Sequence, residues 1–182
     1  YVWIVDPLDG TTNFTHGHPD FAVTLALQVN DTIELGVVFD PLRDELFAAR
    51  RGQGAWLNDR RIQVSKTQQL DRSLLVTGFP YDRRTNPHNN LREDNAFLMK
   101  AQGVLRSGSA AIDLSSVASS RVDGYWEYRL SPWDMAAGLL LVREAGGRVT
   151  DMRGEELAVP QADVVASNGS IHAEMMNVLQ LS

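Results

Sequence analysis

Three aspartates are the residues of this chain best able to do chemistry. Asp6 and Asp9 are separated by Pro7 and Leu8 near the start of the sequence, and Asp134 stands far downstream. Magnesium takes carboxylate and carbonyl oxygens as ligands and keeps open positions for water and phosphate. Asp6, Asp9 and the Leu8 carbonyl therefore indicate half of a magnesium site, to which Asp134 could add a further carboxylate.

The residues around Asp6 and Asp9 predict how these side chains are positioned. Residues 3–5 form an apolar, β-rich strand that we expect to end at Asp6, because Pro7 stops a central strand. Gly10 and the residues after it form a turn into a helix start, whose free N–H groups favour an anion. The sequence thus predicts a cation and a phosphate side by side.

Each segment alone also has an ordinary structural explanation. Aspartates beside proline and glycine are common turn residues. Asp134 falls in the first turn after Pro132, where an acid stabilises a helix through its dipole. Residues 132–145 have an apolar helical pattern that ends at a pair of glycines. Only the two segments taken together favour a site.

Together the segments resemble the inositol monophosphatase family. Its signatures match DPLDGTTNF at 6–14 and WDMAAG at 133–138, the latter followed by EAGG. The resemblance continues through GVVFDPLRDELFAARRGQGAW, the GSAA run, DGYWE and VVASN, so it covers nearly the whole chain. It implies an αβαβα sandwich and a lithium-sensitive enzyme that hydrolyses phosphate monoesters with magnesium-activated water.

The resemblance also implies which residues hold the metal and the water. By this correspondence the metal ligands are Asp6, Asp9, Asp134 and the carbonyl of Leu8, which would bind two or three Mg²⁺ ions. Thr11 corresponds to a threonine that helps to orient the attacking water. Asp6, Asp9, Thr11 and Asp134 are therefore the expected catalytic set.

A second group of residues is expected to bind the substrate. By the same resemblance, Gly10 and Thr11 correspond to the phosphate cradle. Asp9, Ala110 and Glu127 correspond to positions that contact substrate hydroxyls. These roles are assigned from the family pattern. The position of Glu127 alone would not indicate one, because an acid at the end of a strand is usually just exposed to solvent.

The chain departs from the family pattern at its start. Family members carry upstream helices and an acidic pair whose glutamate ligates metal and activates the water, whereas this chain begins at Tyr1 on the first strand. We therefore expect a fragment without its N-terminal helical segment. Its first layer would be incomplete and expose apolar surface, and the fragment alone would be inactive.

Length and composition narrow the class of protein. The 182 residues, 43% of them hydrophobic, can bury a core, and we expect one catalytic domain over 1–182. The net charge of −6 argues against a broad nucleic-acid surface, and no apolar stretch reaches transmembrane length. The absence of cysteine fits a reducing compartment, so we expect a cytoplasmic protein. With the family resemblance, we also expect a homodimer at full length.

The hydrophobic pattern predicts an α+β or layered α/β fold. An antiparallel meander is expected early in the chain, with strands at 21–29, 33–39, 45–50 and 54–57. Further strands are expected at 73–77, 124–128 and 164–166. Helices are expected at 89–102, 109–121, 132–145 and 172–181. The charged segment 81–90 is expected to be a mobile loop.

Several alternatives stay open. The expected substrate is myo-inositol 1-phosphate, but relatives with the same metal core act on histidinol phosphate, fructose 1,6-bisphosphate or phosphoadenosine nucleotides. A non-catalytic role through a protein partner is the alternative of another class. His16 and His18 have ligand-like spacing, yet without cysteine we expect polar loop residues and not zinc ligands. Ser109 is expected to cap a helix.

Overall fold

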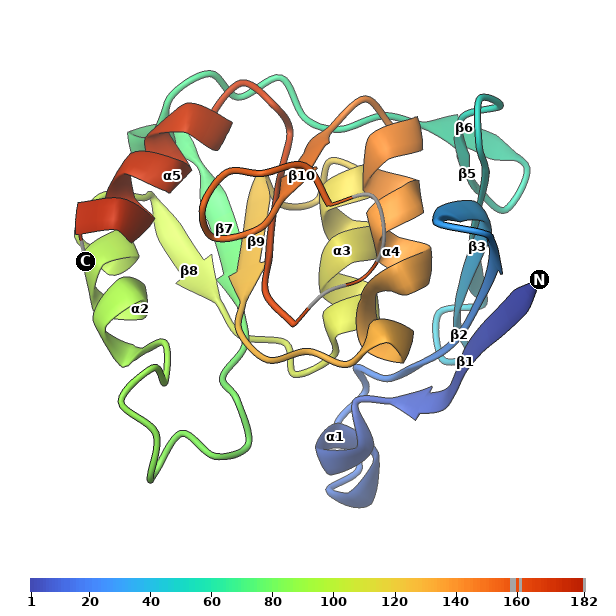
Figure 1. The fold of residues 1–182 in the computed structure, drawn as a ribbon, viewed down its shortest axis with the longest axis horizontal. Coiled ribbons are helices and arrows are strands. Elements are labelled where there is room, and N and C mark those ends of the chain that lie inside the picture. The colour runs from blue at the N-terminus through green and yellow to red at the C-terminus, as the bar shows by residue number, and fades with distance from the viewer. Residues whose placement is uncertain (158–159, 161, 182) are drawn as a thin grey trace.

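Six strands early in the chain form an antiparallel meander in which each strand pairs with the next, as expected (Figure 1). They are β1 (Val2–Asp9), β2 (Ala22–Val29), β3 (Thr32–Asp40), β4 (Glu45–Arg50), β5 (Ala55–Leu57) and β6 (Arg60–Ile62). The computed structural model describes residues 1–157, 160 and 162–181. Asn30, Asp44 and Asn58 turn the chain between strands with φ of 52°, 52° and 51°, a conformation that Asn and Asp tolerate.

The first strand runs beyond the point predicted from Pro7. β1 continues to Asp9, so the expectation that it ends at Asp6 is wrong. The reason is that β1 is the edge strand of its sheet and has only β2 beside it. The missing N–H of Pro7 therefore breaks no hydrogen bond to a strand on the other side. The register against β2 shifts between Asp6 and Asp9. This bulge places both aspartates at the end of the same strand.

The second sheet is mixed and has five strands. In spatial order they are β10 (Arg148–Thr150), β11 (Val164–Ser167), β9 (Gly124–Glu127), β7 (Leu74–Thr77) and β8 (Gly103–Leu105). β7 runs parallel to β8 and β9, and the other pairs are antiparallel. Strands β6, β8 and β10 were not predicted, because three residues are too few to show alternation.

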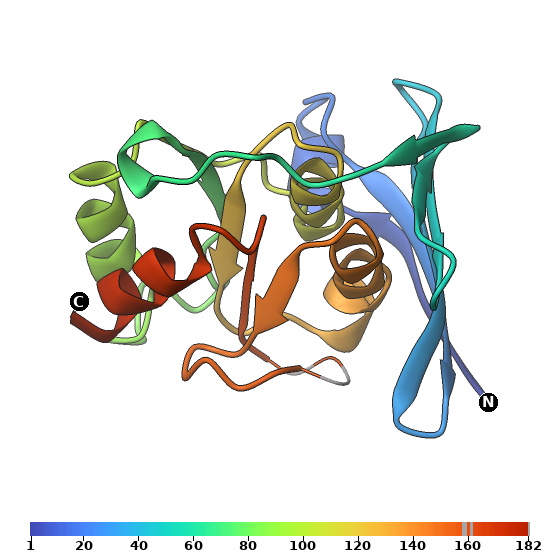
Figure 2. The ribbon, with the colours of Figure 1, turned by 90° about the horizontal axis from the view of Figure 1, so that it is seen from above.

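The helices and sheets form alternating layers (Figure 2). The helices are α1 (Thr11–Thr15), α2 (Leu91–Leu98), α3 (Ala110–Ala118), α4 (Pro132–Glu144) and α5 (His172–Leu181), and a 3-10 turn, η1, covers Leu70–Arg72. α3 and α4 lie between the sheets, and α2 and α5 cover the other face of the second sheet. This is the mixed, layered architecture that we expected. None of the helices in the described part of the chain is long and apolar enough to cross a membrane.

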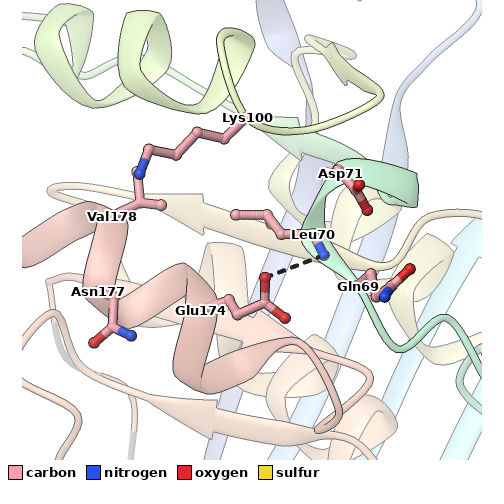
Figure 3. Close-up of a pocket in the computed structure, with 7 residues that line it drawn as sticks. All are labelled: Gln69, Leu70, Asp71, Lys100, Glu174, Asn177 and Val178. Atoms are coloured by element: carbon pink, nitrogen blue, oxygen red, sulfur yellow. Dashed lines mark hydrogen bonds between the residues drawn. The ribbon is translucent and has the colours of Figure 1, made fainter.

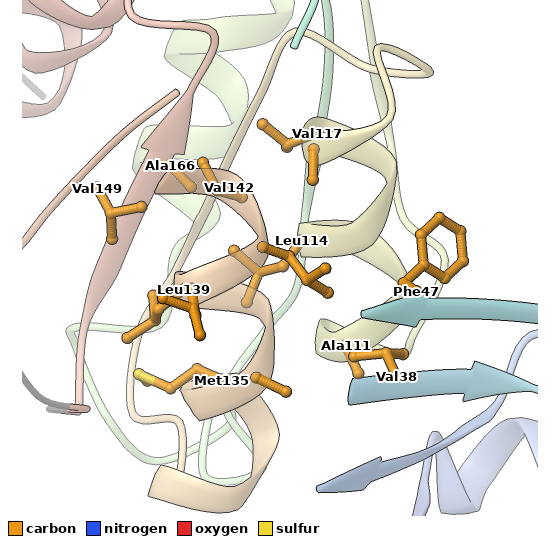
Figure 4. Close-up of a cluster of buried hydrophobic side chains, with 14 of the residues drawn as sticks. Val38, Phe47, Ala111, Leu114, Val117, Met135, Leu139, Val142, Val149 and Ala166 are labelled. Carbon is orange, nitrogen blue, oxygen red and sulfur yellow. The ribbon is translucent and has the colours of Figure 1, made fainter. Parts of the chain in front are cut away.

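α4 is the centre of the core. Its residues 135–142 are all buried, because a helix between two sheets has no solvent side. Its Leu139 packs with side chains from other elements, such as Leu114 and Val149, in one apolar cluster (Figure 4). β3 approaches α4 so closely at Gly36 that a Cβ there would lie 2.8 Å from the carbonyl oxygen of Ala137. The packing of α4 therefore fixes the position of its first turn.

Two predicted helices are shorter than expected. The helix predicted over 89–102 begins at Leu91 and ends at Leu98. Asn90 precedes it with φ of 70°, and its buried side chain donates to Gly78 O and accepts from the Trp126 indole. Asn90 thus anchors the loop to the second sheet and does not extend the helix. α3 similarly stops at Ala118, short of the predicted 121.

The outer face of the first sheet is apolar. The register places Val5, Leu25, Val37, Ala48 and Trp56 in one row across five strands. Val5 and Trp56 are 48% and 40% exposed. In the described part of the chain the helices that contact this sheet, α3 and α4, lie on its inner side (Figure 2). This agrees with the exposed apolar surface that we expected.

Replacing Gly36 with alanine should destabilise the fold. The added Cβ would meet backbone atoms of a buried helix, which cannot rotate aside, so we expect the free energy of unfolding to fall by about 2 kcal/mol. Urea denaturation measures this loss. Gly103→Ala is the matched control, because its Cβ would meet only a Leu74 methyl at 3.3 Å. Equal losses for the two variants would contradict the close packing of β3 on α4.

Candidate active site

Asp6, Asp9 and Asp134 converge at one end of the molecule. β1 supplies the first two, and the first turn of α4 supplies the third. Each offers one carboxylate oxygen, and these three oxygens all lie within 4.8 Å of one another. We call these three residues the acid cluster. The structure thus unites the two segments that the sequence singled out.

Backbone groups fix the orientation of two of these carboxylates. Asp6 Oδ1 accepts from the N–H of Leu8 at 2.9 Å, and Asp134 Oδ2 accepts from the N–H of Ser131 at 2.7 Å. The bond to Ser131 is the N-terminal helix role that Asp134 was expected to have. Asp134 therefore caps α4 and joins the acid cluster at the same time, and the second oxygen of each carboxylate remains for the cluster.

Asp9 is held by the N-terminus of a second helix. Its Oδ2 accepts from Ser109 Oγ at 2.5 Å and from the N–H of Ala111 at 2.9 Å, both at the start of α3. Asp9 is only 7% exposed, and burial raises its pKa to about 6, with smaller contributions from Asp134 and Asp6. The donors at α3 act in the opposite direction.

The acid cluster fits a divalent cation. Burial raises the pKa of Asp134 as well, and the neighbouring Asp6 raises it further. Three carboxylates this close repel one another, and a cation between them relieves that repulsion. The Leu8 carbonyl accepts from Thr11 Oγ1 at 3.0 Å and has a second lone pair. The donor set is all oxygen, which suits magnesium.

The acid cluster lies in a cleft of about 660 Å³. All the site residues expected from the sequence line this cleft: Asp6, Leu8, Asp9, Gly10, Thr11, Ala110, Glu127 and Asp134. Gly10 precedes α1 with φ of 83°, and a Cβ on it would lie 2.8 Å from the carbonyl oxygen of Asp20. Only glycine fits this turn.

Glu127 ends β9 and faces the cleft together with the acid cluster. Tyr125 donates its hydroxyl to Glu127 Oε2 at 2.6 Å. Gly78 lies directly against the carboxylate, because a Cβ on Gly78 would overlap it. Burial raises the pKa of Glu127 to about 7, Asp9 adds to the rise, and the Tyr125 bond opposes it. Glu127 is therefore a positioned acid of the cleft, unlike an ordinary exposed acid at a strand end.

Sequence reasoning missed several of these supporting residues. Ser109 was expected to cap α3, which it does by accepting from the N–H of Ile112 at 3.3 Å, but its bond to Asp9 was not foreseen. The contact of Tyr125 with Glu127 could have been predicted, because residues two apart on a strand share a face. The role of Gly78 had no such signal, because the segment after β7 meets Glu127 only in the folded structure.

A second hollow of about 530 Å³ lies away from the acid cluster (Figure 3). η1, α5 and the chain after α2 form it, and Lys100 and Asp71 lie on its rim. Glu174 accepts there from the N–H of Leu70 at 3.4 Å. That bond supports the packing of α5 on η1, so we assign no chemistry to this hollow.

The raised pKa of Asp9 predicts how stability depends on pH without divalent cations. Between about pH 4 and about pH 6, Asp9 carries a proton more often in the folded protein than in the unfolded chain. The contribution of Asp9 therefore makes the free energy of unfolding fall as pH rises. Asp9→Asn should remove about 3 kcal/mol of that fall. Thermal melts in a chelator from about pH 4 to about pH 8 would test this.

The comparison with Asp9→Asn is necessary because His172 acts in the opposite direction. Burial lowers the pKa of His172 to about 4, so its contribution to stability increases with pH in the same window. The difference between the wild-type and Asp9→Asn curves isolates Asp9. Parallel curves for the two proteins would contradict the raised pKa.

The sequence matches the model of the inositol monophosphatase family over residues 1–181. An inositol-1-monophosphatase of Synechocystis is 51% identical over 179 residues, which cover 98% of this chain and 62% of that protein. The Nus factor SuhB of Pseudomonas aeruginosa is 44% identical over 182 residues, with 99% and 67% covered. The chain thus spans 62% of the length of the Synechocystis relative.

Solved structures agree with these relatives. The structure of inositol monophosphatase from Anabaena superposes with a TM-score of 0.96 at 50% identity, and the match covers 98% of this chain and 71% of that one. The extragenic suppressor protein suhB from Bartonella henselae gives 0.91 at 45% identity, with 98% and 69% covered. From its sequence and its fold, this chain belongs to the inositol monophosphatase family.

Proposed function

We propose that this chain carries the active site of a magnesium-dependent phosphatase that hydrolyses myo-inositol 1-phosphate to inositol and phosphate. The observation that supports this most strongly is the acid cluster, whose oxygens lie within 4.8 Å of one another inside a cleft. Family membership points to the same chemistry. A phosphate-release panel on the full-length protein, with and without magnesium, tests the proposal.

The acid cluster would hold two or three magnesium ions, with the Leu8 carbonyl as an additional ligand. Bound magnesium supplies charge neutralisation of the phosphate and a water of lowered pKa. Thr11 donates its hydroxyl proton to Leu8 O, which leaves its oxygen free to accept from that water. Thr11 would thereby orient the water toward the phosphorus.

The rest of the cleft would bind the substrate. The left-handed turn at Gly10 and the start of α1 at Thr11 would receive the phosphate beside the acid cluster. Glu127 faces the same cleft and would accept hydrogen bonds from the polyol hydroxyls, with Asp9 and Ala110 on the same wall. A protein of net charge −6 that binds a phosphate needs either a local basic pocket or bridging cations, and the acid cluster favours the cations.

Other substrates of the same chemical class compete with this one. Histidinol phosphate, fructose 1,6-bisphosphate and phosphoadenosine nucleotides are phosphate esters that the same metal chemistry could cleave. Glu127 favours an uncharged polyol, since a carboxylate accepts hydroxyl donors and repels a second phosphate. The phosphate-release panel should therefore include all four substrates.

A regulatory role through a partner is the second candidate. The Pseudomonas aeruginosa relative is named Nus factor SuhB, a name that points to partners other than a small phosphate ester. An acid cluster in a cleft favours catalysis, so we place this role second. A full-length protein that releases no phosphate from any ester with magnesium would favour the regulatory role.

The proposal concerns the whole protein, of which this chain covers part of the length seen in relatives. An upstream helical segment would cover the apolar outer face of the first sheet and bring a glutamate to the acid cluster. Without that segment residues 1–182 would be inactive. A cytoplasmic location and a homodimer at full length belong to the same proposal.

Asp134→Asn in the full-length protein should abolish activity while the fold survives. Losing one charge weakens cation binding, so we expect kcat/KM to fall at least on the order of 100-fold, the upper range for changes to partners of metal ligands. The Asn oxygen can still accept from the N–H of Ser131, which preserves the cap. Steady-state kinetics at saturating magnesium measures this, and near-normal turnover would refute the metal assignment.

Asp151→Asn is the matched control for this substitution. Asp151 is 7% exposed and, like Asp134, accepts from backbone N–H groups, those of Arg153 and Glu155 at 2.8 and 2.9 Å. It caps a loop outside the cleft, so we expect its replacement to leave turnover unchanged.

Glu127→Gln should impair a polyol phosphate more than a small generic phosphate ester. Charge-assisted bonds to substrate hydroxyls contribute about 1.5–3 kcal/mol each, and only the polyol can form them. Tyr125→Phe removes the hydroxyl that orients Glu127 and should shift selectivity in the same direction by less. The ratio of the two kcat/KM values reports this. Equal losses on both substrates would place Glu127 in the general scaffold.

A further inference from the structure

Asp113 is a buried acid without a basic partner. It lies in the first turn of α3 and is 2% exposed. Its Oδ1 accepts from Ser107 Oγ at 2.5 Å, and its Oδ2 has no hydrogen-bond partner among the described residues. A buried carboxyl group that is only half satisfied destabilises a fold. Its position therefore calls for an explanation beyond packing.

A chain of contacts leads from Asp113 to the acid cluster. Ser107 Oγ, which Asp113 holds, accepts in turn from the N–H of Ser109 at 3.2 Å. Ser109 then donates its own hydroxyl to Asp9 Oδ2 at 2.5 Å. Asn13 secures the same loop from the other side by donating to the carbonyl of Ser107 at 2.8 Å. The loop between β8 and α3 is thus fixed at both ends.

This chain of contacts decides which oxygen of Asp9 faces the acid cluster. Ser109 and the N–H of Ala111 both occupy Oδ2, so Oδ1 is the oxygen left for a ligand. Ser109 can reach Asp9 only while the loop keeps its conformation, with Gly108 at φ of 91°. Without Asp113 to hold it, the Ser107 side chain could turn away from the N–H of Ser109. The loop could then change its conformation.

We propose that Asp113 is a positioning residue for the divalent-cation site, acting through Ser107 and Ser109 to fix the orientation of Asp9. This inference rests on the proposed function, because it assumes a cation at the acid cluster. Asp113 itself touches neither cation nor substrate. Its loss should weaken cation binding through Asp9 and leave the other ligands in place.

Magnesium titration of the full-length protein by calorimetry tests this directly. Asp113→Ala should lower magnesium affinity about 10- to 100-fold, the range for residues that orient metal ligands. Asp113→Asn keeps an acceptor for Ser107 and should stay close to the wild type. Ser109→Ala combined with Asp113→Ala should lose little more than either change alone, because both act through one path.

Asp123→Ala is the matched control for a merely structural role. Asp123 is another buried acid, 7% exposed, that accepts from a serine hydroxyl, Ser65 Oγ, at 2.5 Å. Its other oxygen accepts from the N–H of Leu74, far from the acid cluster. Its replacement should lower the melting temperature and leave magnesium affinity unchanged.

The outcomes separate this proposal from the function on which it rests. Wild-type affinity in Asp113→Ala, with a lower melting temperature as in Asp123→Ala, would overturn the positioning role alone. No magnesium binding by the wild type would overturn the proposed function as well. If Asp113→Ala fails to fold, Ser107→Ala breaks the same path with a smaller change, and its magnesium affinity decides the question.

Discussion

The N-terminal ends of two helices position two of three mutually repelling carboxylates, Asp9 and Asp134, while the N–H of Leu8 on β1 holds the third, Asp6. α3 presents the Ser109 hydroxyl and the N–H of Ala111 to Asp9, and α4 contributes Asp134 from its own first turn. Helix N-termini carry partial positive charge, which offsets part of the repulsion. Burial is the main cause of the raised pKa values of Asp9 and Asp134, and the remaining repulsion between the carboxylates raises them further. A bound cation would remove this repulsion, which supports our proposal that the acid cluster is a cation site.

The two helices can do this only because the fold fixes them against both sheets. α4 is buried along most of its length and meets the backbone of β3 at Gly36. α3 packs on α4, where Gly138 lies so close to Leu114 that a Cβ on the glycine would be 2.5 Å from the Leu114 Cβ. Helix positions set by backbone contacts cannot shift by much. The acid cluster therefore inherits its geometry from the core between the sheets.

Much of this arrangement could be predicted from the sequence, because the determining signals are local. The meander follows from alternating apolar strands with Asn and Asp turns, and α4 follows from an apolar pattern with Pro132 at its start. The two signature segments also identified Asp6 and Asp134 as candidates. The continuation of β1 through Pro7 could not be predicted, since sequence alone does not reveal that β1 is an edge strand.

The supporting contacts could not be predicted, because they join segments far apart in the chain. Ser109 reaches Asp9 across a separation of 100 residues, and Gly78, just after β7, lies against Glu127. Asn90 resembles the start of a helix in the sequence, but it anchors a loop to Trp126. Such contacts depend on tertiary packing, and no local pattern encodes them.

Anomalous diffraction can decide whether Asp6, Asp9 and Asp134 form one divalent-cation site, as we propose. Crystals of the full-length protein would be soaked with Mn²⁺ as a substitute for Mg²⁺. We expect an anomalous peak among the three carboxylates, within bonding distance of the oxygens that the protein donors leave free. A crystal with well-ordered carboxylates, saturating Mn²⁺ and no peak among them would contradict it.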